Sequence, residues 1–135
     1  MKQLLMHIIL FVFLTALCSC NTKVSKIKNT EITFEKNNYD FHSIASKQYV
    51  SATFKFTNTG EEPLLIQNVK STCGCTVPEY PKEMIRPNDK GEIKVVYDAK
   101  LPGRFNKTII VFYNGKDSPK TLTIKGEVIL KKKLE

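Results

Sequence analysis

Two cysteines separated by one glycine, Cys73-Gly74-Cys75, are the residues of this 135-residue sequence whose types and spacing could do chemistry. Thiols this close can act as a redox couple, hold a soft metal ion, form a local disulfide or remain inert. In an extended chain their Cα atoms would lie about 6.6 Å apart on one face, near the upper limit of about 6.8 Å for a disulfide. Gly74 can bend the backbone and bring them closer, so all four possibilities stay open.

The N-terminal segment indicates the compartment of these thiols. Residues 4–17 are almost wholly apolar, but the run is shorter than the roughly 20 residues of a comfortable membrane span and has the flanks of a secretory signal. It ends in Leu17-Cys18-Ser19-Cys20. A small residue directly before Cys20 and a leucine three positions before it resemble the lipobox of bacterial lipoproteins. We therefore expect residues 1–19 to be a cleaved signal helix and Cys20 to be acylated.

Two other interpretations of this segment stay open, an uncleaved anchor helix and a signal removed without acylation. Cys18 is a poorer acceptor, because Leu17 would then stand at the position of the small residue. A diacylated cysteine carries two chains, which is enough for stable membrane anchoring. The expected location is the bacterial cell envelope, outside the cytoplasm, where disulfides form and persist.

The mature chain keeps only Cys73 and Cys75, so a framework of several disulfides is excluded and the domain must be stable on its core. Removal of residues 1–19 leaves 116 residues (135 − 19), the size of one domain. We expect a lipidated tether over residues 20–29, a folded domain over residues 30–130 and a basic tail over residues 131–135. The tether has no acidic residue before Glu31. It thus lacks the acidic run that marks surface export in many lipoproteins of the Bacteroidetes, which favours a periplasm-facing protein.

The positive charge of the chain is spread over its surface. The net charge is +8, or +7 without Lys2 of the signal. Basic and aromatic residues do not interleave as they do in a nucleic-acid platform, so we expect no nucleic-acid partner. The charge is that of a solvated surface, or of one weakly attracted to anionic lipid or glycan.

Alternation of apolar and polar residues with a period of two predicts β-strands throughout the mature chain. The stretches read as strands are residues 30–36, 50–58, 92–100 and 121–130, which alternate, and residues 63–70 and 107–114, which are more continuously apolar. Residues 109–113 are apolar on both faces and predict a central strand. Six or seven short strands without a helical stripe predict an all-β, immunoglobulin-like antiparallel β-sandwich of about seven strands. The phenylalanines with inward parity, expected in its core, are Phe34, Phe41, Phe54, Phe56, Phe105 and Phe112.

Four stretches of this pattern resemble one bacterial family. They are residues 39–44 (YDFHSI), residues 54–99, which hold the Asn-Thr-Gly turn and the Cys-Gly-Cys-Thr stretch, residues 103–114 (GRFNKTIIVFYN) and residues 122–128 (LTIKGEV). They are similar to the domain of unknown function numbered fifteen seventy-three, which is common among lipoproteins of the Bacteroidetes and related in fold to Hydin-type immunoglobulin-like domains. The resemblance covers residues 32–128 and implies a fold and a compartment, but no activity.

The chain departs from that family at His42, where glycine is usual, and at Asn88, where a Pro-Gly turn is usual. Asn and His tolerate a positive φ better than most residues, so the backbone can survive both changes.

A metal site would need more ligands than two thiols. With Met84, the cysteines Cys73 and Cys75 would suit Cu(I), but the family more often has proline at the Met84 position. Besides Met84, the only histidine or methionine in the mature chain is His42. We therefore expect no metal and no cofactor, with the Cys73, Cys75 and Met84 set as the alternative.

No phosphate-binding loop, zinc-protease helix or serine nucleophile elbow is present in the sequence, so we predict no enzyme. The main hypothesis is a lipid-anchored envelope module that binds an unidentified envelope protein or glycan through its loops or a strand edge. The alternative is a thiol-redox or copper-handling lipoprotein that acts through Cys73 and Cys75. The cysteine pair is the only sequence feature that distinguishes these two hypotheses.

The lipobox yields the first testable prediction. Metabolic labelling with an alkyne fatty acid should mark the wild-type protein and should not mark Cys20→Ser. Equal labelling of the two proteins would show that Cys20 is not the acylated residue.

Overall fold

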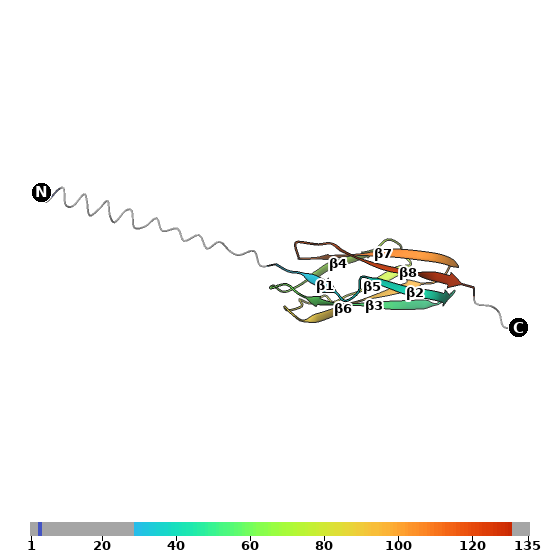
Figure 1. Cartoon of the computed structure of the whole chain (residues 1–135). Coiled ribbons are helices and arrows are strands. Elements are labelled where there is room, and N and C mark those ends of the chain that lie inside the picture. The colour runs from blue at the N-terminus through green and yellow to red at the C-terminus, as the bar shows by residue number, and fades with distance from the viewer. Residues whose placement is uncertain (1–2, 4–28, 131–135) are drawn as a thin grey trace.

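The computed structural model describes residue 3 and residues 29–130 (Figure 1). The expected signal helix, Cys20, nearly all of the tether and the basic tail lie outside these residues. Within the described part of the chain, no helix reaches the length and apolarity that crossing a bilayer requires.

Eight strands form two four-stranded sheets that pack face to face. The strands are β1 Ile32–Phe34, β2 Asn38–Ala45, β3 Tyr49–Asn58, β4 Ile66–Ser71, β5 Thr76–Glu79, β6 Lys90–Asp98, β7 Gly103–Tyr113 and β8 Lys120–Ile129. Sheet A has the order β1-β3-β6-β5, and sheet B has the order β2-β8-β7-β4. The predicted all-β, immunoglobulin-like sandwich is therefore confirmed, with β7, which contains the doubly apolar residues 109–113, inside sheet B as predicted.

Two details differ from the expected antiparallel sandwich of about seven strands. The edge strand β2 pairs with β8 in parallel. In addition, β2 and β5 were not among the predicted strands. Strand β2 is mostly exposed and its register shifts between Asp40 and Ser43, so it has no clean alternation. Strand β5 has only four residues and contains Pro78, which is tolerated there because β5 is an edge strand.

The core lies between the sheets and follows the predicted parity. On β3, Ala52, Phe54 and Phe56 are buried, whereas the alternating Thr53 and Lys55 are exposed. Of the other phenylalanines, Phe105 is buried, and Phe34 and Phe41 pack against the core from partly buried positions. The prediction for Phe112 is wrong, because it faces outward on β7 beneath the ammonium of Lys70. Both faces of β7 are apolar, so parity alone could not decide which one faces the core.

The registers define two opposite ends of the sandwich. Ile32 at the start of β1 pairs with Asn58 at the end of β3, so the chain enters the sandwich at what we call the β1 end. The start of β3, Tyr49, pairs with Asp98, whose N–H donates to the carbonyl of Cys75. We call this the disulfide end. The ten residues of β3 place the two ends about 30 Å apart.

Both departures from the family pattern have left-handed backbones, with φ of 55° at His42 and 67° at Asn88. The expectation that histidine and asparagine replace glycine at such positions is confirmed.

The face assignment of β3 yields the second prediction. Phe54→Ala and Phe56→Ala should each lower the free energy of unfolding by about 3–5 kcal/mol, because each leaves a cavity between the sheets. Thr53→Ala and Lys55→Ala should change it by about 0.5 kcal/mol or less. Urea denaturation of the four variants checks this, and equal effects on the two faces would contradict the assignment.

Candidate functional site

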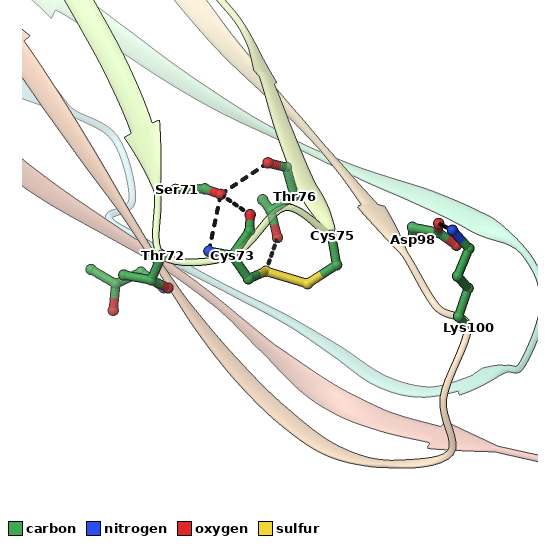
Figure 2. Close-up of a disulfide and its surroundings, with 8 residues drawn as sticks. Ser71, Thr72, Cys73, Cys75, Thr76, Asp98 and Lys100 are labelled. Atoms are coloured by element: carbon green, nitrogen blue, oxygen red, sulfur yellow. Dashed lines mark hydrogen bonds and ion pairs between the residues drawn. A yellow bond between two sulfur atoms is a disulfide. The ribbon is translucent and has the colours of Figure 1, made fainter.

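The Cys-Gly-Cys stretch forms the turn by which the chain crosses from one sheet to the other (Figure 2). Strand β4 ends at Ser71 in sheet B, and β5 begins at Thr76 in sheet A. Residues 72–75 therefore span the open side of the sandwich. The sequence placed the pair correctly at the end of a strand, but gave no sign that another strand follows at once.

Cys73 and Cys75 lie at bonding distance as a disulfide, with their Cα atoms 5.3 Å apart. Of the four possibilities left open by the sequence, this geometry is that of the local disulfide. Both cysteines are partly exposed, and Cys75 packs against the core.

Hydrogen bonds from Ser71 and Thr76 hold the same turn. The hydroxyl of Ser71 lies within hydrogen-bonding distance of the carbonyl oxygens of Cys73 and Thr76, and accepts a bond from the N–H of Cys73. The N–H of Thr76 donates to the carbonyl of Cys73, and the Thr76 hydroxyl lies 3.4 Å from the Cys73 sulfur. The turn therefore has polar supports that do not depend on the disulfide.

This arrangement also blocks the outer edge of β5. The carbonyl of Cys75 points toward β6, where it accepts from Asp98, so by alternation the backbone groups of Thr76 and Pro78 point outward. The backbone N–H of Thr76 donates to the carbonyl of Cys73, and its backbone carbonyl accepts from the hydroxyl of Ser71. Pro78 has no N–H. An added strand would find no N–H donor over this stretch, which is a common protection of exposed edges.

A cleft of about 530 Å³ opens beside the disulfide, between the turn and the β6–β7 connection. Tyr97 and Phe105 stack in it with ring centroids 4.2 Å apart, and both are more than nine-tenths buried. Burial raises the pKa of Tyr97, and the charge of Asp98 raises it further, so the phenol is neutral at physiological pH. Leu101 lies at the rim with 80% of its surface exposed.

The cleft is lined by more positive than negative charge. Asp98, the one acidic residue among its described lining residues, forms an ion pair of 2.7 Å with Lys100 (Figure 2). The hydrogen bond to this carboxylate raises the pKa of Lys100. Arg104 and Lys107 also line the cleft, and neither has an ion-pair partner among residues 29–130.

Lys107 is the site residue that the sequence analysis missed. On β7 the buried residues Phe105, Ile109 and Val111 share odd parity. Lys107 has this parity too, and is partly buried. Extending the inward pattern from Ile109 back to Phe105 would have shown a lysine at a core position.

The other candidate residues lie elsewhere. Met84 precedes Ile85, whose carbonyl accepts a hydrogen bond from Asn58 at the β1 end. The structure therefore does not bring Met84 to Cys73 and Cys75. Among the described residues, no group of three or more His, Cys, Asp or Glu side chains is placed to share a metal ion.

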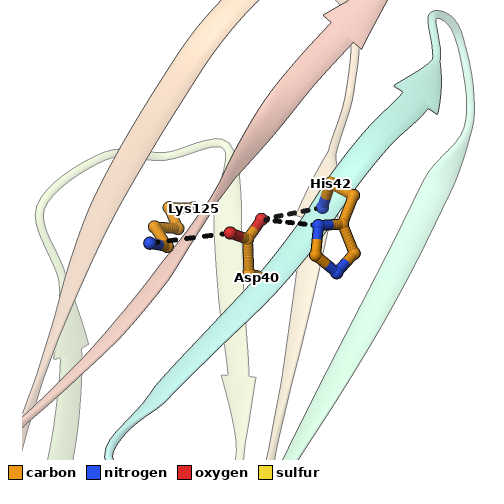
Figure 3. A network of polar contacts seen from close by, with 3 residues as sticks. All are labelled: Asp40, His42 and Lys125. Atoms are coloured by element: carbon orange, nitrogen blue, oxygen red, sulfur yellow. Dashed lines mark hydrogen bonds and ion pairs between the residues drawn. The ribbon is translucent and has the colours of Figure 1, made fainter.

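His42 lies on the edge strand β2, in a small polar network (Figure 3). The backbone N–H of His42 donates to the Asp40 carboxylate at 2.8 Å, and the Nδ1 of its imidazole lies 3.8 Å from the same oxygen. The backbone hydrogen bond lowers the pKa of Asp40, and Lys125 contributes from 3.5 Å. The side chain of His42 is 87% exposed, so these contacts form a surface bulge and not an enclosed site.

The family described as "Protein of unknown function (DUF1573)" matches residues 32–128. The chain belongs to the DUF1573 family. This match covers the whole sandwich from β1 to the end of β8, except for Ile129, and it confirms the resemblance seen in the sequence. No protein with a curated description matches the chain significantly.

Solved structures share the fold of this DUF1573 domain at low identity. A protein of unknown function from Porphyromonas gingivalis W83 matches 74% of this chain and 47% of its own, at 13% identity and a TM-score of 0.64. The human CEP192 ASH/PapD-like domain matches 76% of this chain and 88% of its own, at 8% identity and a TM-score of 0.64. The Pseudomonas aeruginosa CupB2 chaperone matches 71% of this chain and 55% of its own, at 12% identity and a TM-score of 0.52. This chain thus spans about half the length of the Porphyromonas protein, and these likenesses define a fold.

The polar supports of the turn yield the third prediction. A disulfide that closes so short a loop adds only about 1–2 kcal/mol in the chain-entropy model, and Ser71 and Thr76 hold the turn without it. The melting temperature should therefore fall by only a few degrees with reductant or in Cys73→Ser/Cys75→Ser, and mass spectrometry of the oxidised protein should show the loss of two hydrogens within one peptide. A fall of tens of degrees, or a disulfide-linked dimer, would contradict a local bond with little effect on stability.

Proposed function

We propose that this DUF1573 protein is a lipid-anchored, non-catalytic interaction module of the cell envelope, facing the periplasm. The observation that supports this function is the position of the disulfide turn and its cleft, at the end of the sandwich opposite the point where the chain enters it. A membrane-anchored domain of this kind presents its binding surface away from the lipid.

The dimensions support such a presentation. A tether of about ten residues between acylated Cys20 and the domain reaches at most roughly 30–35 Å. The sandwich adds about 30 Å between its β1 end and its disulfide end. The module would therefore hold its disulfide end clear of the membrane surface while the lipid retains it there.

The end loops are better suited to binding than the edges of β1, β2 and β5. The edge of β5 is blocked as described above. Strand β1 has only three residues, and β2 is interrupted by the left-handed His42. At the disulfide end, in contrast, Tyr49 and Leu101 are 72% and 80% exposed. Exposed apolar side chains mark a contact surface where they form a contiguous patch rimmed by polar groups.

A thiol-redox role is the second candidate, because the Cys73–Cys75 disulfide is partly exposed beside a cleft. In such a role a partner dithiol would give two electrons to the disulfide, leaving the partner oxidised and both cysteines as thiols. The copper variant of this alternative loses its third ligand, because Met84 lies near the β1 end. The proposal itself assigns no catalytic residue and no cofactor.

The fourth prediction tests the module in living cells. A photo-crosslinking amino acid placed at Leu101 should yield a crosslinked envelope species, whereas the same group at Lys116, in the β7–β8 turn at the β1 end, should yield little or none. The species should persist in Cys73→Ser/Cys75→Ser.

Each part of the proposal has its own contrary result. The absence of crosslinks from both positions would contradict an interaction module that binds through its disulfide end. Loss of the crosslink in the double cysteine variant would instead favour the redox role.

A further inference from the structure

We infer that the cleft at the disulfide end binds an acidic peptide segment of a partner protein, with a carboxylate at Lys107 and an apolar side chain against Leu101. The inference rests on the proposed function and specifies the chemistry of its partner. The occupant follows from the charge, the apolar surface and the blocked strand edge of the cleft.

Lys107 carries the argument for an anionic group. Its inward parity on β7 directs the side chain into the opening between the two sheets, between the buried Phe105 and Ile109. Lys107 is partly buried as a residue, and no carboxylate among residues 29–130 forms an ion pair with its ammonium. A ligand carboxylate would supply this missing partner through a charge-assisted hydrogen bond.

The surrounding charges favour the same class of ligand. Among the residues that the structure describes, Asp98 is the only carboxylate lining the cleft, and Lys100 engages it. Arg104 adds a second exposed cation at the rim. Glu127 lies opposite Arg104 in the β7–β8 register, but no ion pair joins them. The net local charge is therefore positive, which attracts acidic partners.

The apolar surface favours a peptide over an anionic glycan. Sugars commonly bind on exposed aromatic faces, but the rings of Tyr97 and Phe105 stack on each other and are buried. The accessible apolar side chains that line the cleft are those of Leu101 and Pro102, and the exposed ring of Tyr49 at the same end is not among its lining residues. A cleft of about 530 Å³ falls within the range of pockets that receive compact ligands. It suits a carboxylate with an adjacent apolar side chain.

The mode of binding follows from the adjacent strand. Because the outward backbone groups of Thr76 are engaged and Pro78 has no N–H, a peptide cannot extend sheet A at β5. On the β5 side of the cleft, recognition then depends on side chains and on the shape of the cleft. An acidic segment should bind with a modest affinity that decreases with ionic strength.

The fifth prediction uses defined probes and the full-length protein in detergent. A fluorescein-labelled Glu-Glu-Leu-Glu-Glu peptide should bind saturably in an anisotropy titration, with a Kd of about 1 mM or tighter. Replacement of its leucine by serine, or of its glutamates by glutamine, should weaken binding severalfold. An oligogalacturonate of similar charge should bind more weakly than the peptide.

Substitutions at lysine provide the matched comparison. Lys107→Met should weaken peptide binding by about tenfold or more, because the charged hydrogen bond is lost, and Lys107→Glu should abolish it. Lys116→Met removes the same charge from the β1 end and should bind like the wild type. The melting temperature of Lys107→Met should be no lower than that of the wild type, which separates loss of the site from loss of the fold.

The contrary results are equally defined. The absence of peptide binding, or binding that Lys107→Met leaves unchanged, would overturn the assignment of the cleft. Equal or tighter binding of the oligogalacturonate would overturn the peptide class. In each case, a crosslink from Leu101 in cells would still support the proposed interaction module. The absence of that crosslink would contradict the proposed function as well.

Discussion

The side-chain amide of Asn58 closes one end of the sandwich, and the asymmetry of the molecule depends on this closure. Asn58 is fully buried. Its Nδ2 donates to the carbonyls of Glu62 and Ile85, and its Oδ1 accepts from the N–H of Gly60. One side chain thus joins the turn after β3 to the segment before β6. Buried carbonyls without such partners would each be costly, so the Asn-Thr-Gly turn fixes how the chain leaves sheet A.

The gap between the two sheets is closed at one end of the domain and left open at the other. At the β1 end, Asn58 and the contact between Leu64 and Ile85 close the gap between the sheets with hydrogen bonds and apolar packing. At the disulfide end a lysine stands where the parity of β7 calls for an apolar residue. An apolar side chain at this position would bury more apolar surface between Phe105 and Ile109. Departures from the local pattern of this kind are most often found where a surface has a function.

The sequence predicted what depends on local alternation. It placed β3, β6 and the central β7, and it anticipated the left-handed backbone of His42 and Asn88. It missed β2 and β5, because an exposed strand with a register shift and a four-residue strand with proline carry no clean period. It also did not find the cleft, which exists only because β5 pairs with β6 and brings Cys75 beside Tyr97. Such contacts between distant segments are set by register, which no short stretch encodes.

The disulfide has its main consequence in geometry and not in stability. A ring this small removes little entropy from the unfolded chain, and Ser71 and Thr76 already hold the turn. What the bond adds is a fixed path for the chain from sheet B to sheet A. With that path fixed, the N–H of Thr76 stays directed at the turn and away from a neighbouring strand. The same short motif therefore protects an edge from strand addition and forms one wall of the cleft that holds Lys107.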